Sequence, residues 1–232
     1  MKIINLIMFG LMVVMNYLAN ALPINDKTTG ELSAQYPNLF VPAGITFSIW
    51  GVIYLMLLIF CIIQFRNENK PIVEAIGWAF SLSCLLNALW IIAWHYEILP
   101  LSLIIMLGLL TALVYINIQL RNEPIGITKA AFGIYLGWIC IATIANVTAL
   151  LVHYNWGGTD VNWAITMIFI GLVITALTLY RLNNPLLGLA VIWAFIGIVI
   201  NRQNDYPAIA ISALIAIILM SVVTVWAFMK RV

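Results

Sequence analysis

Long hydrophobic stretches separated by short polar segments run along almost the whole chain. A helix that spans a membrane needs about 20 mainly apolar residues, because its backbone groups must find hydrogen-bond partners within the segment. Eight stretches meet or approach this length, running approximately from Ile3 to Leu22, Ala43 to Phe65, Ala75 to His95, Leu99 to Leu120, Ala130 to Val152, Trp163 to Tyr180, Leu186 to Ile200 and Pro207 to Met229. The seventh is the shortest. The pattern predicts an all-α, polytopic transmembrane bundle of about eight helices.

The composition leads to the same class of protein. Of the 232 residues, 65% are hydrophobic and 8% are charged, whereas roughly a quarter of the residues in a soluble domain are charged. The net charge is only +2, and the ten Lys and Arg residues are dispersed along the chain. Such a distribution offers no surface for phosphate backbones, so it argues against a nucleic-acid partner. The lipid bilayer is the expected surrounding.

The basic residues predict an orientation, because loops rich in Lys and Arg stay on the cytoplasmic side. If the N-terminus is cytoplasmic, only Lys27 and Arg202 lie outside, and the basic residues inside are Lys2, Arg66, Lys70, Arg121, Lys129, Arg181, Lys230 and Arg231. We therefore expect a multi-pass protein of the cell membrane with both termini cytoplasmic. The first stretch has an alternative reading as a cleavable signal peptide ending at Ala19-Asn20-Ala21, which would leave seven helices.

Patterns typical of enzymes and metal sites are missing from the sequence. It has no Gly-rich phosphate loop, no His pair at helical spacing and no nucleophile elbow. The three cysteines lie inside apolar runs without metal-ligand spacing. We therefore predict neither catalytic nor metal-binding residues. His95 and Glu97 lie close enough in the sequence to pair with each other.

Aromatic and amide side chains form stripes on three predicted helices, at spacings that place them on one helix face. The candidate binding residues are Trp50 and Tyr54 on the second helix, Asn87 and Trp90 on the third, and Tyr135, Trp138, Ala142 and Asn146 on the fifth. An amide in hydrocarbon is costly unless it finds a partner. Asn87 and Asn146 therefore either join helices or line a pocket, whereas Asn117 is expected near a helix end, in reach of water.

The same stripes carry a resemblance to the tryptophan-rich sensory protein family, also called TspO/MBR or translocator proteins. The residues that carry it are Pro37 and Pro42 with Trp50 and Tyr54, the run Leu86-Asn87-Ala88-Leu89-Trp90, and Tyr135-Leu136-Gly137-Trp138 followed by Ala142, Thr143 and Asn146. They are similar to the family's proline-rich loop with its W-x-x-x-Y helix, its N-x-x-W element and its Y-x-x-W helix with a later Asn. The chain departs from the family pattern at Leu39, Val41 and Ser83.

The resemblance covers about residues 1–155, which implies a five-helix region followed by three additional transmembrane helices in 156–232. It implies a receptor or transport-related protein that binds a hydrophobic small molecule, of the tetrapyrrole kind such as porphyrin or haem, in a pocket under the first loop. Trp50, Tyr54, Trp90 and Trp138 would stack on this ligand, and Asn87 and Asn146 would hold the helices or donate a hydrogen bond.

Three matters stay open at this point. The chain could instead be a permease or a permease subunit, with its tryptophans serving only in packing. Enzymatic breakdown of a bound porphyrin is neither favoured nor excluded. No resident cofactor is indicated, since porphyrin or haem would be a ligand, and a homodimer is left open.

Overall fold

The computed structural model describes residues 1–21, 24–156 and 160–230, and all the regular structure in these ranges is helical. The α-helices are α1 (Lys2–Ala21), α2 (Thr29–Gln35), α3 (Ile49–Ile63), α4 (Lys70–Ile76), α5 (Ala79–His95), α6 (Leu99–Gln119), α7 (Ile127–His153), α8 (Val161–Leu182), α9 (Leu186–Arg202) and α10 (Pro207–Met229). Three short 3-10 helices are η1 (Ile24–Asp26), η2 (Gly44–Ser48) and η3 (Asn67–Asn69). The predicted all-α bundle is confirmed. Leu22, where the first predicted stretch ends, lies outside the described residues.

The spans agree with the hydrophobic pattern. Within the described residues, six helical stretches are long and apolar enough to cross a membrane, namely α1, η2 with α3, α6, α7, α8 and α10. η3 with α4, followed by α5 at an angle of 59°, makes a seventh when the bent pair is counted as one span. The apolar helix α9 has 17 residues and falls short of that length. It corresponds to the stretch that the sequence indicates as the shortest. The protein is therefore a multi-pass membrane protein.

The third predicted stretch is not one uninterrupted helix. The chain bends at Gly77, where α4 ends and the backbone adopts a φ of +58°. Glycine accepts this conformation because it has no Cβ atom. The prediction of a single helix from Ala75 to His95 is wrong at this point. The run of apolar residues continues through the turn at Gly77, so the hydrophobic pattern does not show where the helix breaks.

A helix that the hydrophobic pattern does not predict lies in the polar connection after α1. Thr28 and Glu31 form a capping box at the start of α2: the Glu31 amide donates to Thr28 Oγ1, and the Thr28 amide donates to the Glu31 carboxylate. Leu32 is fully buried on the inner face of this short helix. The part of the connection that forms α2 is thus packed into the bundle.

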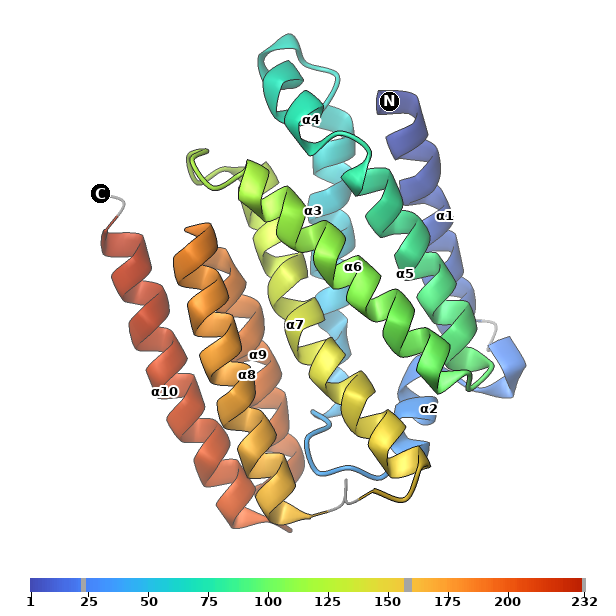
Figure 1. Ribbon diagram of the computed structural model, residues 1–232, viewed down its shortest axis with the longest axis vertical. Helices are drawn as coiled ribbons and strands as arrows, with labels where there is room; N and C mark the ends of the chain where they lie inside the picture. Colours follow the sequence, from blue (N-terminus) through green and yellow to red (C-terminus); the bar gives the residue numbers. More distant parts are fainter. Residues whose placement is uncertain (22–23, 157–159, 231–232) are drawn as a thin grey trace.

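The long helix α7 is the centre of the bundle and contacts α3, α6, α8 and α9. Figure 1 shows α1, α3, α5 and α6 on one side of it and α8, α9 and α10 on the other. The start of α1 and the end of α10 lie at the same end of the bundle, here called the terminal end. Residues 24–48, here called the roof segment, close the opposite end, which we call the roof end.

Close backbone contact joins the last three helices to the others. A Cβ atom at Gly137 of α7 would collide with the carbonyl oxygen of Leu187 and lie 3.1 Å from the Cβ of Ala190, both on α9. Small residues allow membrane helices to approach to this distance, where van der Waals packing is strongest. Helix α9 is therefore tightly packed against α7, and α10 packs in turn on α8 and α9.

Candidate functional site

Beneath the roof segment lies a small, mainly apolar cavity with a volume of about 60 Å³. Its walls come from the roof segment, α5 and α7, and include Asn38, Pro42, Phe47, Trp90, Trp94, Trp138, Ala142 and Asn146. We call it the aromatic cavity. Its indole rings come from two helices that are separated by a third helix in the sequence, so only the folded bundle brings them together.

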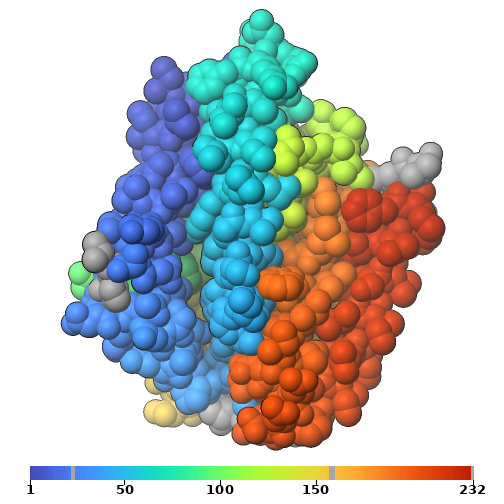
Figure 2. Space-filling model, turned by 180° about the vertical axis from the view of Figure 1, so that it is seen from behind, coloured from blue at the N-terminus to red at the C-terminus, as the bar shows by residue number. Residues whose placement is uncertain are grey.

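Two larger hollows adjoin the aromatic cavity. The first, of about 490 Å³, is a groove between α1, α3 and α5 that is lined by Asn16, Tyr17, Phe47, Trp50, Tyr54 and Trp90, among others. We call it the lateral groove, and Figure 2 shows the face on which α1 and α3 lie side by side. The second, of about 590 Å³, lies between the roof segment and the end of α9 and includes Asn38, Pro42, Arg202 and Tyr206. Phe47 lines all three spaces.

The structure places six of the eight predicted site residues at these spaces. Trp90, Trp138, Ala142 and Asn146 line the aromatic cavity, and Trp50 and Tyr54 line the lateral groove together with Trp90. The Trp50 ring stacks on Tyr54 at 5.5 Å between centroids and meets the edge of Trp138 at 6.1 Å. The two spaces thus share one continuous aromatic wall.

Asn87 and Tyr135 lie elsewhere, in the packed core between helices. Asn16 Nδ2 donates to Asn87 Oδ1 at 2.7 Å, and Asn87 Nδ2 donates to the Tyr135 hydroxyl at 3.0 Å. All three side chains are more than nine-tenths buried. Of the two roles left open for Asn87, the geometry corresponds to joining helices, because both ends of its amide are occupied by protein groups.

Asn146 has the opposite environment. Its Oδ1 accepts a hydrogen bond of 3.2 Å from Ser102 Oγ, while its Nδ2 has no partner among the described residues. The indole N–H groups of Trp90, Trp94 and Trp138 and the Oδ1 of Asn38 are likewise buried without a partner. Each of these five residues is at most 8% exposed and lines the aromatic cavity. Four donors and one acceptor without partners among the described residues therefore belong to side chains that line one small space.

Some residues of these spaces are not among the predicted site residues. Trp94 is one of them, although it follows Trp90 by one helical turn and helical spacing places it on the same face. Phe47 and Asn38 lie in the roof segment, where no helical period indicates which side chains point inward. Asn16, which lines the lateral groove and binds Asn87, lies on α1, and nothing in its sequence surroundings indicates its partner on α5.

The expected pair of His95 and Glu97 does not form. His95 Nε2 lies 3.0 Å from Thr29 Oγ1, and its Nδ1 lies 3.0 Å from the Ile24 carbonyl oxygen. Glu97 instead accepts hydrogen bonds from Lys27 Nζ at 3.0 Å and from the Tyr36 hydroxyl at 2.7 Å. Both residues therefore bind the roof segment to the end of α5, each through its own partners.

These contacts perturb two pKa values at the roof end. The hydrogen bonds from Tyr36 and Lys27 lower the pKa of Glu97 from its ordinary value. Burial, and then the neighbouring Glu97 carboxylate, raise the pKa of Tyr36 far above its usual range. Glu97 is thus held as a carboxylate and Tyr36 as a neutral donor.

Asn117 is not at a wet helix end as expected, because it is fully buried. Its Nδ2 donates to the carbonyl oxygens of Leu113 and Phe132 at 2.9 and 3.1 Å, and its Oδ1 accepts from Asn184 Nδ2 at 2.8 Å. The hydrophobic pattern missed this because the covering groups, Phe132 of α7 and Asn184 of the α8–α9 connection, are distant in the sequence. Asn117 joins α6 to α7 and to the α8–α9 connection.

The comparison with protein families agrees with this architecture. A family model described as TSPO-like protein matches residues 2–226, which includes the last three helices as well as the region that carries the motifs. Searches of curated proteins and of solved structures give no match. Because the match extends over nearly the whole chain, this multi-pass membrane protein belongs to the TSPO-like protein family.

Proposed function

We propose that this protein is a receptor or transport-related protein that binds a planar hydrophobic small molecule of the tetrapyrrole kind, such as porphyrin or haem. The carrying observation is that four buried donors without partners among the described residues belong to side chains that line the aromatic cavity. Burying a donor without an acceptor costs free energy. A ligand that brings oxygen or imine-nitrogen acceptors offsets that cost, and its ring offers apolar area to the tryptophans.

The sizes of the spaces support a particular placement. The aromatic cavity, at about 60 Å³, is too small for a macrocycle, whereas the lateral groove of about 490 Å³ falls in the range of small-molecule sites. We propose that the ring lies in the lateral groove against Trp50, Tyr54 and Trp90. Its edge would reach the aromatic cavity, which Trp138 and Asn146 line.

Packing below the site favours binding over permeation. Phe60, Phe80 and Phe132 form an edge-to-face cluster with ring centroids 5.1 to 5.7 Å apart, and each is at most 1% exposed. They come from the halves of α3, α5 and α7 nearer the terminal end. A dry aromatic cluster in that place blocks a path from the roof end through the bundle, so the permease alternative requires a rearrangement of the core.

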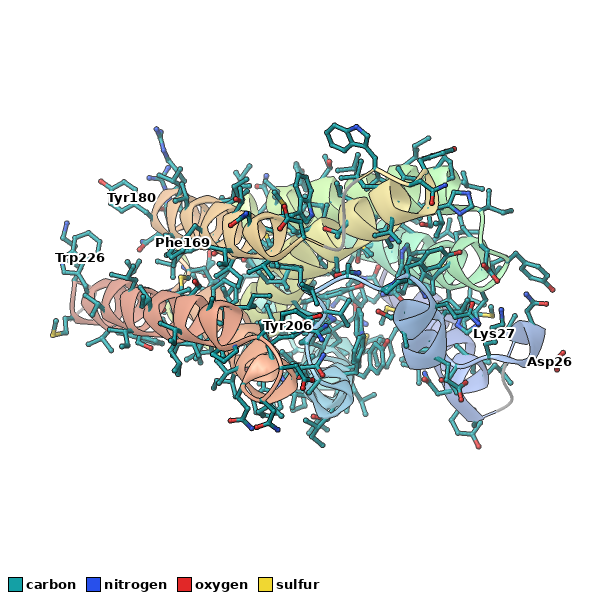
Figure 3. The ribbon with its side chains drawn as sticks, turned by 90° about the horizontal axis from the view of Figure 1, so that it is seen from below. Asp26, Lys27, Phe169, Tyr180, Tyr206 and Trp226 are labelled. Atoms are coloured by element: carbon teal, nitrogen blue, oxygen red, sulfur yellow. The ribbon has the colours of Figure 1, made fainter. Side chains whose placement is uncertain are left out.

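Titration with protoporphyrin IX tests the proposal. Quenching of tryptophan fluorescence in the detergent-purified protein should saturate, and Trp138→Phe should weaken binding several-fold, since an aromatic contact contributes about 1 kcal/mol. The matched control is Trp226→Phe: Trp226 stacks on Tyr180 with Lys230 Nζ 4.1 Å from its ring centroid. Figure 3 shows Trp226 and Tyr180 at the far edge of the bundle from Lys27 of the roof segment.

The outcomes separate the candidate functions. Saturable binding that Trp138→Phe weakens and Trp226→Phe leaves unchanged, with equal melting temperatures, supports the receptor. Quenching that never saturates, or equal affinity in both variants, contradicts the proposed site. Porphyrin flux into liposomes containing the protein would favour the permease instead.

A further inference from the structure

The last three turns of α9 run alongside the roof segment and hold it by hydrogen bonds. Among the described residues, five such bonds cross the contact: Trp193 Nε1 to Thr46 O (2.8 Å), Ala43 N to Gly197 O (2.9 Å), Asn201 Nδ2 to Val41 O (2.9 Å), Arg202 Nε to Leu39 O (3.0 Å) and Arg202 Nη2 to Asn38 O (3.0 Å). In Figure 2 the start of α3 and the residues just before it lie against the end of α9. Residues 38–46, in the second half of the roof segment, are therefore bound to α9.

The order of these contacts follows from helix geometry. Trp193, Gly197 and Asn201 are four residues apart, so they lie one above another on a single face of α9. Their partners run in the opposite direction along the roof segment, from Thr46 back to Val41. Gly197 and Asn201 thus satisfy backbone groups of residues 36–43, which have no regular helix of their own, while Trp193 binds Thr46 in η2.

Gly197 makes this approach possible. A Cβ atom at this position would collide with Thr46 Oγ1 and lie 2.8 Å from the Cβ of Pro42. Any other residue would therefore push the roof segment away from α9. The direct hydrogen bond from the Ala43 amide to the Gly197 carbonyl oxygen depends on this close contact.

Two of the residues whose backbone groups α9 holds, Asn38 and Val41, form part of the cavity wall. Asn38, Val41 and Pro42 line the aromatic cavity, and the same residues border the space at the end of α9. We infer that α9 is a latch that fixes the roof segment over the ligand site, with Trp193, Gly197, Asn201 and Arg202 as positioning residues. The latch gives the C-terminal helices a role in ligand retention, a role that rests on the proposed function.

Hydrogen exchange of the ligand-free protein tests the latch without any ligand. Trp193→Phe and Asn201→Ala each remove one hydrogen bond, so the backbone amides of residues 38–47 should exchange roughly two- to tenfold faster. Trp226→Phe and Asn204→Ala are matched controls, because Trp226 lies on α10 and Asn204 is exposed just beyond α9. Unchanged exchange in both latch variants, with melting temperatures equal to wild type, overturns the proposal.

A second measurement asks whether the latch controls the ligand. Bound protoporphyrin IX should dissociate several-fold faster from Trp193→Phe and Asn201→Ala than from the two controls. Faster amide exchange in the roof segment with an unchanged dissociation rate of protoporphyrin IX would overturn the claim that the latch controls ligand release. If the wild-type protein shows no saturable binding at all, the proposed function fails, and the exchange data alone then decide whether α9 holds the roof segment.

Discussion

Asn16 on α1 and Asn87 on α5 are joined by a hydrogen bond of 2.7 Å, although 71 positions separate them in the sequence. Asn87 in turn donates a hydrogen bond to the Tyr135 hydroxyl of α7. Three helices are thus linked by one chain of side chains in the apolar core. In hydrocarbon no water is present to bond an unpaired amide. The hydrogen bonding of each of these three side chains therefore depends on the other two.

We therefore predict that Asn87→Leu lowers stability by about 1 to 3 kcal/mol, because it leaves Asn16 and Tyr135 without their partner. The double variant with Asn16→Leu should lose less than the sum of the two single changes. Unfolding in one detergent measures both, with Asn122→Leu in the exposed α6–α7 connection as the control. Additive losses would show that the two amides do not act together.

Asn146→Leu should show the reverse behaviour, with weaker ligand binding and little loss of stability. Its Nδ2 has no protein partner to lose, and Ser102 keeps a hydrogen bond to the Leu99 carbonyl oxygen at 3.0 Å. We expect a several-fold weaker affinity for protoporphyrin IX in the fluorescence titration. The comparison is Asn162→Leu, at the exposed start of α8. A large drop in melting temperature with unchanged affinity would assign Asn146 to packing.

Acid should loosen the roof end through Glu97, whose pKa is lowered by hydrogen bonds from Tyr36 and Lys27. A carboxyl whose native pKa is lowered stabilises the fold above its ordinary pKa, and this contribution is lost as the pH falls through the lowered value. The melting temperature of the wild type should therefore drop between about pH 5 and about pH 3.

Glu97→Gln should have a lower melting temperature at neutral pH and a smaller further drop in acid. Glu68→Gln is the control, since Glu68 makes only an exposed ion pair with Arg66 at 3.6 Å. If the melting temperatures of wild type and Glu97→Gln fall in parallel with pH, Glu97 does not cause the loss of stability in acid. Other acidic groups, such as Glu31, would then explain it.

The charge distribution predicts that both termini are cytoplasmic. Reporter fusions after Lys70 and Lys129 should then read as cytoplasmic, and a fusion after Gly158, which lies outside the described residues, as external. The opposite assignment at any of the three positions would contradict the predicted orientation. An N-terminus processed at Ala21 would remove the first span and with it the Asn16–Asn87 hydrogen bond.

Several features of the protein follow from the sequence alone. The apolar stretches predict the long helices because a membrane-spanning backbone must satisfy itself within one segment. Periodicity places Trp50 with Tyr54, and Trp90 with Trp94, on shared helix faces, and the structure shows both pairs stacked. These properties are local, so a run of about 20 residues contains the information for them.

The tertiary structure decided which polar groups are paired. Asn87 and Asn146 look alike in the sequence, each in an apolar helix beside a tryptophan stripe. Both ends of the Asn87 amide are bonded, whereas Asn146 lines a cavity and its N–H has no partner among the described residues. The contact between the roof segment and Gly197 of α9 joins segments more than 150 positions apart. Such partners are chosen by how helices pack, and packing depends on the shape of every neighbouring side chain, which no single stretch of the sequence contains.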